Sequence, residues 1–180
     1  MIAERAARTL EIGLGYAIAT LFICEGLLRN GSDGRHVAID PFQTASLPGE
    51  ATLFGGAGVR TLGRAGIRAL VQLYEEGSEI VLPRLVSAGR RFDLAFVDGS
   101  HRFENVFVDL VMCGRLLPEH GVVFVDDSHH APVAHAIGYC SSNLGWTVDA
   151  EGADGDDRWT VLRTGPLEVY QRRFTEFVPW

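Results

Sequence analysis

The stretch Leu-Glu-Ile-Gly-Leu-Gly at residues 10–15 decides the fold of this 180-residue chain. A short apolar run ends in two glycines spaced two residues apart, and a segment with helical character, 16–29, follows at once. Glycine lets the backbone adopt positive φ angles and approach a ligand closely, and the first turn of the next helix offers free N–H groups. This order predicts a strand, a tight turn and a helix that bind a ligand together.

An acidic residue follows at the end of the next expected strand. Residues 36–40 read His-Val-Ala-Ile-Asp and predict a strand that ends in Asp40. In a parallel α/β sheet this carboxylate would lie beside the glycine turn, where it can bind a ribose diol. We therefore expect a nucleoside-bearing cofactor, and the alternative is a glycine turn that serves packing alone.

The composition narrows the class of protein. The chain is 47% apolar and 22% charged, as in ordinary globular domains. Its net charge of −7 and the lack of a basic cluster argue against a nucleic-acid partner. All 16 basic residues are arginine, which excludes lysine chemistry. Glu11 and Glu25 interrupt the apolar N-terminal run, so we expect neither a signal peptide nor a membrane span.

The three cysteines, Cys24, Cys113 and Cys140, lack the spacing of a metal site. They lie in apolar segments with helical character, so the sequence predicts reduced, buried thiols. This usage is typical of a cytoplasmic protein.

Strands and helices alternate along most of the chain, which predicts a parallel sheet covered on both faces. The end differs, because residues 146–149 and 158–163 flank a polar turn, 150–157, and indicate an antiparallel hairpin. Residues 41–56 are expected to form a loop. The other expected strands are 7–12, 36–40, 69–74, 92–98 and 122–125, and the expected helices are 16–29, 57–65, 78–88, 103–117 and 131–143.

A second group of polar residues follows two later strands. Asp98-Gly-Ser-His101 ends one apolar run, and Asp126-Asp127 ends the next. Parallel strands end at one edge of a sheet, so these side chains should converge near Asp40. Three carboxylates in one place require protonation or a cation, and Mg²⁺ prefers such oxygen ligands. The ion would lower the pKa of a substrate hydroxyl, and His101 would act as the general base.

Simpler roles exist for each of these residues. The simpler role of Asp98 is to cap the turn before the helix expected at 103–117, as Asp often does, and that of Asp126-Asp127 is to cap the following helix. A histidine on a loop is commonly just solvated. A metal cluster of His129, His130 and His135 is disfavoured because the spacing matches no zinc pattern; His129 or His130 would instead line a substrate pocket.

Residues 11–15 have the form E-x-G-x-G and, with the strand that ends in Asp40, resemble motif I and the acidic loop of class I S-adenosylmethionine-dependent methyltransferases. Residues 92–127 are similar to O-methyltransferases of macrolide sugars and their cephalosporin-pathway homologues. In that group an Asp-Gly-x-His turn and a later acidic-Asp pair hold Mg²⁺, and the histidine is the base. Catechol-type O-methyltransferases are also similar, but they place lysine where His101 stands.

The resemblance implies a role for each matching position. The residues expected to bind the cofactor are Glu11, Gly13, Gly15, Asp40, Gly77, Ser78 and Asp98, with Gly77 and Ser78 in the adenine-contacting turn. The residues expected to hold Mg²⁺ are Asp98, Asp126 and Asp127. His101 is the expected base.

The sequence therefore predicts a three-layer, Rossmann-like α/β fold whose sheet is mostly parallel, with a C-terminal antiparallel hairpin. Residues 1–165 form the methyltransferase domain, and the tail, 166–180, packs on it or on a partner. Few residues precede the first strand, where members of that group usually carry helices over the cofactor, so either the start is truncated or the tail or a partner subunit supplies the lid. A domain without a lid and with an aromatic tail favours a homodimer. The expected activity is Mg²⁺-assisted methylation of a small-molecule hydroxyl group.

Two other functions remain open at this stage. A methyltransferase fold without activity would bind the cofactor and serve as an interaction subunit. A nicotinamide-dependent enzyme would share the glycine turn, but Ile18 in place of a third glycine and the terminal hairpin count against it.

Overall fold

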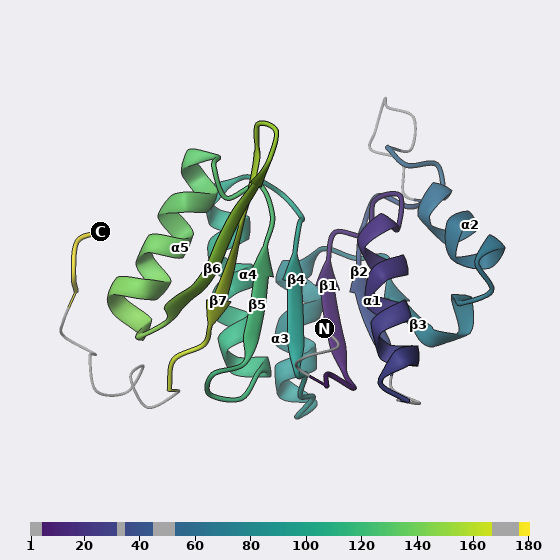
Figure 1. The fold of residues 1–180 in the computed structure, drawn as a ribbon, viewed down its shortest axis with the longest axis horizontal. Helices are drawn as coiled ribbons and strands as arrows, with labels where there is room; N and C mark the ends of the chain where they lie inside the picture. Colours follow the sequence, from purple (N-terminus) through teal and green to yellow (C-terminus); the bar gives the residue numbers. More distant parts are fainter. Residues whose placement is uncertain (1–4, 32–34, 45–52, 167–176) are drawn as a thin grey trace.

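A computed structural model describes residues 5–31, 35–44, 53–166 and 177–180 of the chain. Its centre is a seven-stranded sheet in the order β3-β2-β1-β4-β5-β7-β6 (Figure 1). The five strands β1 to β5 are parallel, while β7 runs antiparallel to β5 and β6 antiparallel to β7. The predicted fold class, a mostly parallel sheet closed by an antiparallel hairpin, is confirmed.

The elements follow the predicted order. The strands are β1 (Thr9–Ile12), β2 (His36–Ile39), β3 (Val71–Tyr74), β4 (Leu94–Val97), β5 (Val122–Val125), β6 (Thr147–Asp154) and β7 (Asp157–Arg163). The helices are α1 (Ile18–Arg29), α2 (Ala57–Arg64), α3 (Ser78–Ser87), α4 (Phe103–Leu116) and α5 (Ala131–Leu144), with a 3₁₀ turn at Arg68–Leu70.

Side chains of the parallel strands alternate between two hydrophobic layers, as the pleat of a strand requires. In β4, Ala95 and Val97 pack with α3, α4 and α5 in the larger layer, together with Leu110 and Cys140. In β2, Ala38 faces the other side and packs with α1 and α2 in the smaller layer. Figure 1 shows α1 in front of the sheet and α3 and α4 behind it.

The smaller layer does not extend across the whole sheet. Phe96 of β4, Phe124 of β5 and Trp159 of β7 stack as a row, with centroid distances of 5.2 and 5.3 Å between neighbouring rings. All three are only half-buried. The sheet was predicted to be covered on both faces, and at Phe96, Phe124 and Trp159 this cover is incomplete.

Two boundaries differ from the sequence prediction for reasons of backbone geometry. The first helix begins at Ile18 rather than residue 16, because Gly15 and Ala17 both adopt left-handed φ angles, +50° and +65°. The hairpin is longer than predicted: β6 and β7 pair up to Asp154 and Asp157, so the turn narrows to Gly155 and one further residue. Gly155 supplies the positive φ angle that such a short turn needs.

The remaining differences are at strand ends. The strand predicted for 69–74 begins at Val71, because the residues before it form the 3₁₀ turn. The first strand begins at Thr9 rather than residue 7, and the strands before Asp40 and Asp98 end one residue earlier, so that both carboxylates belong to the following loops. Part of the predicted loop 41–56, residues 45–52, lies outside the described residues.

The last four residues pack against α5. Asn143 exchanges two hydrogen bonds with the backbone of Val178, at 2.9 and 2.8 Å. The Trp180 ring meets Tyr139 edge-on, with the ring centroids 5.0 Å apart. Residues 167–176 lie outside the described part, so the boundary between domain and tail stays a prediction.

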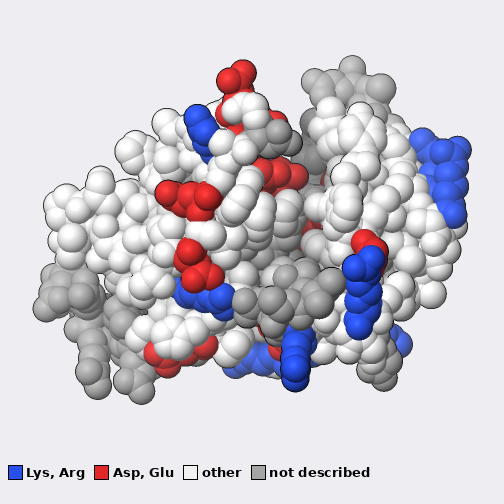
Figure 2. Space-filling model, in the orientation of Figure 1, with Lys and Arg blue, Asp and Glu red and all other residues white. Residues whose placement is uncertain are grey.

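The surface carries its charges unevenly. Acidic side chains surround the upper part of the β6–β7 hairpin, while arginines lie mainly over α2 and along the lower edge (Figure 2). The three cysteines are buried and unpaired, as predicted, and burial raises the pKa of the Cys24 thiol to about 11. The described helices are all too short or too polar to cross a membrane.

Candidate active site

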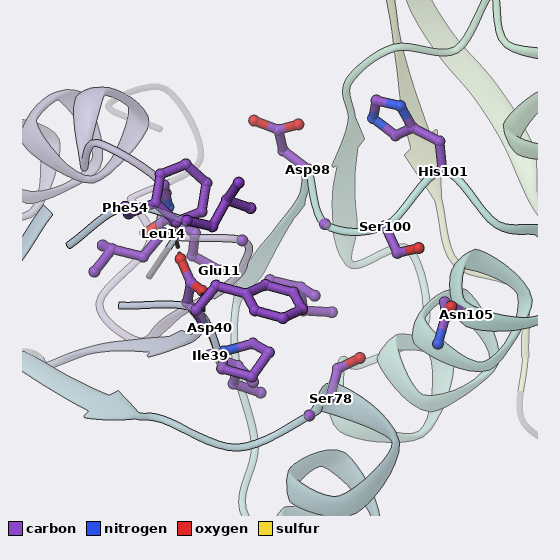
Figure 3. A pocket seen from close by; sticks show the side chains of 18 of the residues that line it. Glu11, Leu14, Ile39, Asp40, Phe54, Ser78, Asp98, Ser100, His101 and Asn105 are labelled. Atoms are coloured by element: carbon purple, nitrogen blue, oxygen red, sulfur yellow. Dashed lines mark hydrogen bonds between the residues drawn. The ribbon is translucent and has the colours of Figure 1, made fainter. Parts of the chain in front are cut away.

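A cavity of about 860 Å³ opens where β1, β2 and β4 end. This is the edge at which open parallel sheets bind ligands, and the volume lies within the range of small-molecule sites. Figure 3 shows Glu11 and Asp40 on one side of the cavity, Ser78 and Asn105 on the opposite side, and Asp98 and His101 along its rim. All seven predicted cofactor residues and the predicted base therefore line one cavity.

The glycine turn lies in contact with the loop after β4. Gly13 has a φ of +93°, and a Cβ atom on it would lie 1.9 Å from the carbonyl oxygen of Asp98. Its N–H donates to the carbonyl of Ile39 at 2.9 Å. Any side chain at this position would push β1 and β4 apart, so the turn requires glycine and leaves its backbone open to a ligand.

Glu11 is fully buried, and only one of its two carboxylate oxygens has hydrogen-bond partners among the described residues. Its Oε2 accepts hydrogen bonds from Thr20 Oγ1 at 2.6 Å and from His36 Nε2 at 2.8 Å. The other ring nitrogen of His36 lies 2.9 Å from Thr9 Oγ1. Among the described residues Glu11 Oε1 has no hydrogen-bond partner, although the residue lines the cavity. A buried carboxylate oxygen of this kind calls for a donor or cation from a ligand.

Asp40 lies at the predicted place but is already engaged. Its Oδ2 accepts from the N–H of Gly15 and from Gln43 Nε2, each at 2.9 Å, and its Oδ1 accepts from the N–H of Phe42 at 2.8 Å. The side chain is 2% exposed. Asp40 thus closes the glycine turn, and its predicted contact with a ribose diol stays a prediction.

Gln43 was missed by the sequence prediction, which treated residues 41–56 as a plain loop. Its Nε2 also donates to the carbonyl of Gly15 at 2.7 Å, and the residue is fully buried. The only signal for it is its place three residues after an acidic strand end.

A second missed residue, Asp109 of α4, contacts the cavity wall formed by the start of α3. Ser78 lines the cavity and hydrogen-bonds the Asp109 carboxylate of α4. Burial raises the pKa of Asp109 to about 7, and the charge of Glu79 adds to this, while the bond from Ser78 opposes it. The sequence carried a signal: Asp109 stands on the buried face of α4, between Val106 and Cys113.

The predicted metal residues lie close enough to influence one another. Burial, followed by the charges of Asp126, Asp127 and Glu11, raises the pKa of Asp98 to about 7. Burial also raises the pKa of Asp126, and the charges of Asp127 and Asp157 add to it. Their combined negative charge fits a divalent cation.

The orientation of these carboxylates is less simple than their charge. Asp126 Oδ1 accepts a hydrogen bond from the N–H of Asp127 at 3.0 Å. Among the described residues, two sets of three place their ligand atoms within 4.8 Å of one another: His101 with Asp127 and His130, and Asp127 with His129 and Asp157. Asp98 and Asp126 belong to neither set, so the structure brings only Asp127 of the predicted three into a converging set.

His101 has a partner that the sequence prediction did not assign to it. Its Nε2 lies 2.9 Å from Asp127 Oδ2. The His101 ring stacks on that of His130, with the centroids 4.8 Å apart, and His130 stacks in turn on His129 at 4.1 Å. A histidine that donates one ring N–H to a carboxylate keeps its other nitrogen free to accept a proton.

Comparison with known proteins places this geometry in a family. The family model described as "Methyltransferase domain" matches residues 10–128. No curated protein matches the sequence. Among solved structures, the O-methyltransferase TomG of Streptomyces achromogenes, in complex with S-adenosylmethionine and involved in tomaymycin synthesis, is 21% identical with a TM-score of 0.71, over 92% of this chain and 76% of that one.

Two further structures have the same fold. An O-methyltransferase of Bacillus cereus, in complex with S-adenosylhomocysteine, is 16% identical with a TM-score of 0.69, over 91% of this chain and 76% of that one. A putative caffeoyl-CoA O-methyltransferase of Staphylococcus aureus is 13% identical with a TM-score of 0.67, over 91% and 78%. Because the family model covers well over half of the sequence, this chain belongs to the methyltransferase-domain family and has the class I fold of S-adenosylmethionine-dependent methyltransferases.

Proposed function

We propose that this chain transfers a methyl group from S-adenosylmethionine to a hydroxyl group of a small molecule, with His101 as the general base. The observation that carries this proposal is the His101–Asp127 pair, 2.9 Å apart, at the rim of the cavity that begins with the glycine turn. The three similar structures named above are described as O-methyltransferases, two of them with the methyl donor or its product bound.

The cavity offers features that a nucleoside cofactor with a cationic end would use. The free oxygen of Glu11 suits an ammonium group, and the bare backbone of Gly13 and Gly15 allows close approach. Ser78, with its hydroxyl held by Asp109, faces the opposite end. When bound, S-adenosylmethionine supplies a methyl group on a positively charged sulfur, which leaves as a neutral thioether.

The chain's own contribution is to prepare the acceptor. With its Nε2–H donated to Asp127, His101 holds a lone pair on Nδ1 that takes the proton of the acceptor hydroxyl. The carboxylate of Asp127 stabilises the imidazolium that results. The methyl group then bonds to the acceptor oxygen, and the proton stays on His101. General-base catalysis of this kind contributes roughly 10²- to 10⁴-fold in rate.

Mg²⁺ forms the second part of the proposal. Asp98, Asp126 and Asp127 would hold it, because burial and then their mutual charges raise the pKa values of Asp98 and Asp126, and a cation would offset this cost. The ion would lower the pKa of the acceptor hydroxyl.

The acceptor is inferred from the mouth of the cavity. Tyr16, Ile18 and Leu53 line it and leave more than half of their surfaces exposed, at 60, 59 and 66%. Such a rim suits a small acceptor with an apolar body and a hydroxyl group at its inner end. The net charge of −7 disfavours nucleic acid. We further propose a cytoplasmic protein and a homodimer, in which the second copy covers this rim.

The test is a calorimetric titration of the whole chain with S-adenosylhomocysteine, with and without Mg²⁺, followed by a panel of phenolic and aliphatic alcohols. We expect micromolar binding, methylated product from at least one alcohol, and a fall in kcat of at least 100-fold for His101→Ala. His120→Ala, an exposed histidine next to the start of β5, is the matched control and should keep full activity. Binding without turnover would support the non-catalytic alternative, and lack of binding would refute the proposal.

A further inference from the structure

Three histidines and one carboxylate meet on two loops beside the cavity. His101 comes from the loop between β4 and α4, while Asp127, His129 and His130 come from the loop between β5 and α5. One nitrogen each of His101 and His130 and one oxygen of Asp127 lie within 4.8 Å of one another. We propose that His101, Asp127 and His130 form a binding site for a late first-row transition metal ion such as Zn²⁺, which shares Asp127 with the Mg²⁺ site proposed above but adds two imidazole ligands.

The ligands are held in place by backbone hydrogen bonds that do not depend on an ion. The N–H of Asp126 donates to the carbonyl of Val97 in β4 at 3.0 Å, and the N–H of Ser128 donates to the carbonyl of Arg158 in β7 at 2.9 Å. Between these anchors the chain turns back on itself, with the N–H of His130 3.0 Å from the carbonyl of Asp127. The loop is therefore tied to both neighbouring strands, which lowers the ordering cost of binding.

The start of α5 fixes the second histidine. His130 is the N-cap of that helix, and its carbonyl accepts the N–H of Ala134 at 2.9 Å. His101 stacks against its ring with an angle of 29° between the planes. The two imidazoles thus reach the same carboxylate from two separately anchored loops.

The donor set decides the class of ion. Two imidazole nitrogens and one carboxylate oxygen suit Zn²⁺, Co²⁺, Ni²⁺ or Fe²⁺, whereas Mg²⁺ prefers oxygen ligands in an octahedron. In a tetrahedral zinc site with bonds of about 2.0–2.2 Å, neighbouring ligand atoms lie roughly 3.3 Å apart. His101 Nε2 and Asp127 Oδ2 are 2.9 Å apart, so an ion can replace the proton between them with a small outward movement of the two side chains.

The surrounding charges favour a cation. Asp126 and Asp157 lie close enough to the site for their carboxylates to interact, and the charge of His101 acts on Asp126 as well. The His101 and Asp127 side chains are 42% and 24% exposed, so an ion can enter from solvent. Acidic side chains near the hairpin tip lie along the same edge of the sheet (Figure 2).

Three protein ligands leave the fourth position of a tetrahedral ion open to water or to an acceptor. Occupancy also has a consequence for catalysis, which rests on the proposed function. An ion on His101 Nε2 leaves the proton of the neutral ring on Nδ1, the atom that would take the acceptor's proton, so Zn²⁺ should inhibit methyl transfer even when Mg²⁺ is present.

The test is a titration of the full chain with Co²⁺, followed by its visible absorption, and with Zn²⁺ by calorimetry. We expect one ion per chain with a micromolar Kd, a cobalt spectrum typical of four-coordinate nitrogen and oxygen ligands, and no displacement by 10-fold excess Mg²⁺. His130→Ala should weaken Zn²⁺ binding at least tenfold. His135→Ala, an exposed histidine one turn later on α5, is the matched control and should leave the Kd unchanged.

Several results would overturn this site. Zn²⁺ binding of equal affinity by His130→Ala and the unaltered chain would overturn it. A loss of Zn²⁺ binding in His129→Ala but not in His130→Ala would also overturn it, since that result would place the ion at Asp127, His129 and Asp157. Displacement by Mg²⁺ would indicate an all-oxygen site. Binding of S-adenosylhomocysteine by each variant shows that it is folded, and it keeps the two proposals apart: a failure of Zn²⁺ binding with the nucleoside still bound refutes the metal site alone.

Discussion

Replacing Gly13 with alanine tests the contact on which the candidate site is built. The new Cβ would lie 1.9 Å from the carbonyl oxygen of Asp98, 2.6 Å from its carbonyl carbon and 3.1 Å from Gly99 Cα. None of these atoms is the end of a flexible side chain, so β1 and the loop after β4 must separate. Overpacking of this kind costs roughly 1–3 kcal/mol, and a positive φ angle for a residue with a Cβ adds about 1–2 kcal/mol. We expect Gly13→Ala to lose roughly 2–5 kcal/mol of unfolding free energy.

Gly66→Ala separates the two contributions. Gly66 also has a positive φ angle, +71°, but a Cβ there would meet no atom within 4 Å. This variant should lose only the backbone cost of about 1–2 kcal/mol of unfolding free energy. Urea unfolding followed by circular dichroism measures both values, and calorimetry should show that Gly13→Ala binds S-adenosylhomocysteine at least tenfold more weakly while Gly66→Ala binds normally. Equal losses of stability and unchanged binding in both variants would refute the close approach of β1 to the β4 loop.

Two other predictions concern buried charges. Between pH 4 and pH 7 folded Asp109 keeps a proton that the unfolded chain has released, so the unfolding free energy falls as pH rises through this window, by up to roughly 4 kcal/mol. Asp109→Asn should therefore be more stable than the unaltered chain at pH 8 and show a weaker pH dependence in urea unfolding; parallel curves would contradict this. His36→Ala should lower the free energy of unfolding by roughly 3–5 kcal/mol, because it leaves Thr20 as the only hydrogen-bond donor to buried Glu11. The double variant Glu11→Gln/His36→Ala removes the buried charge as well, so thermal melting should show it to be more stable than His36→Ala alone.

The order and type of the elements were predictable because each depends on local patterns. Apolar runs, glycine turns and the change from helices to a hairpin all act over a few residues. The exact start of α1 was not predictable, since it depends on the left-handed φ angles at Gly15 and Ala17 in the glycine turn. The length of the hairpin was missed because its outer part, residues 150–157, projects beyond the core and is exposed on both faces. Its side chains are therefore polar, and the sequence prediction interpreted this polar segment as a turn.

The site was predictable in outline because a parallel sheet brings its strand ends to one edge. The rule gives the edge but not the directions of the side chains. Sequence spacing placed Asp98, Asp126 and Asp127 in one cluster, and the structure turns Asp127 toward His101 instead. That orientation follows from the positive φ of Asp127, +52°, and from the tight turn that brings His130 back beside it. Neither feature leaves a mark in the sequence, where Asp126-Asp127 followed by two histidines is equally consistent with a helix cap.

The buried carboxylate of Glu11 depends on residues that lie outside the E-x-G-x-G motif. An isolated carboxylate would be costly at 0% exposure, yet its Oε2 is satisfied by Thr20 from α1 and by His36 from β2. His36 is fixed in turn by Thr9 on β1, two residues before Glu11. This chain of hydrogen bonds leaves Oε1 as a buried side-chain acceptor at the cavity wall that has no hydrogen-bond partner among the described residues. A ligand that brings a hydrogen-bond donor or a positive charge to that oxygen would remove the desolvation cost of the unpaired carboxylate oxygen. The first strand can therefore favour a cationic cofactor independently of the residues that bind the acceptor.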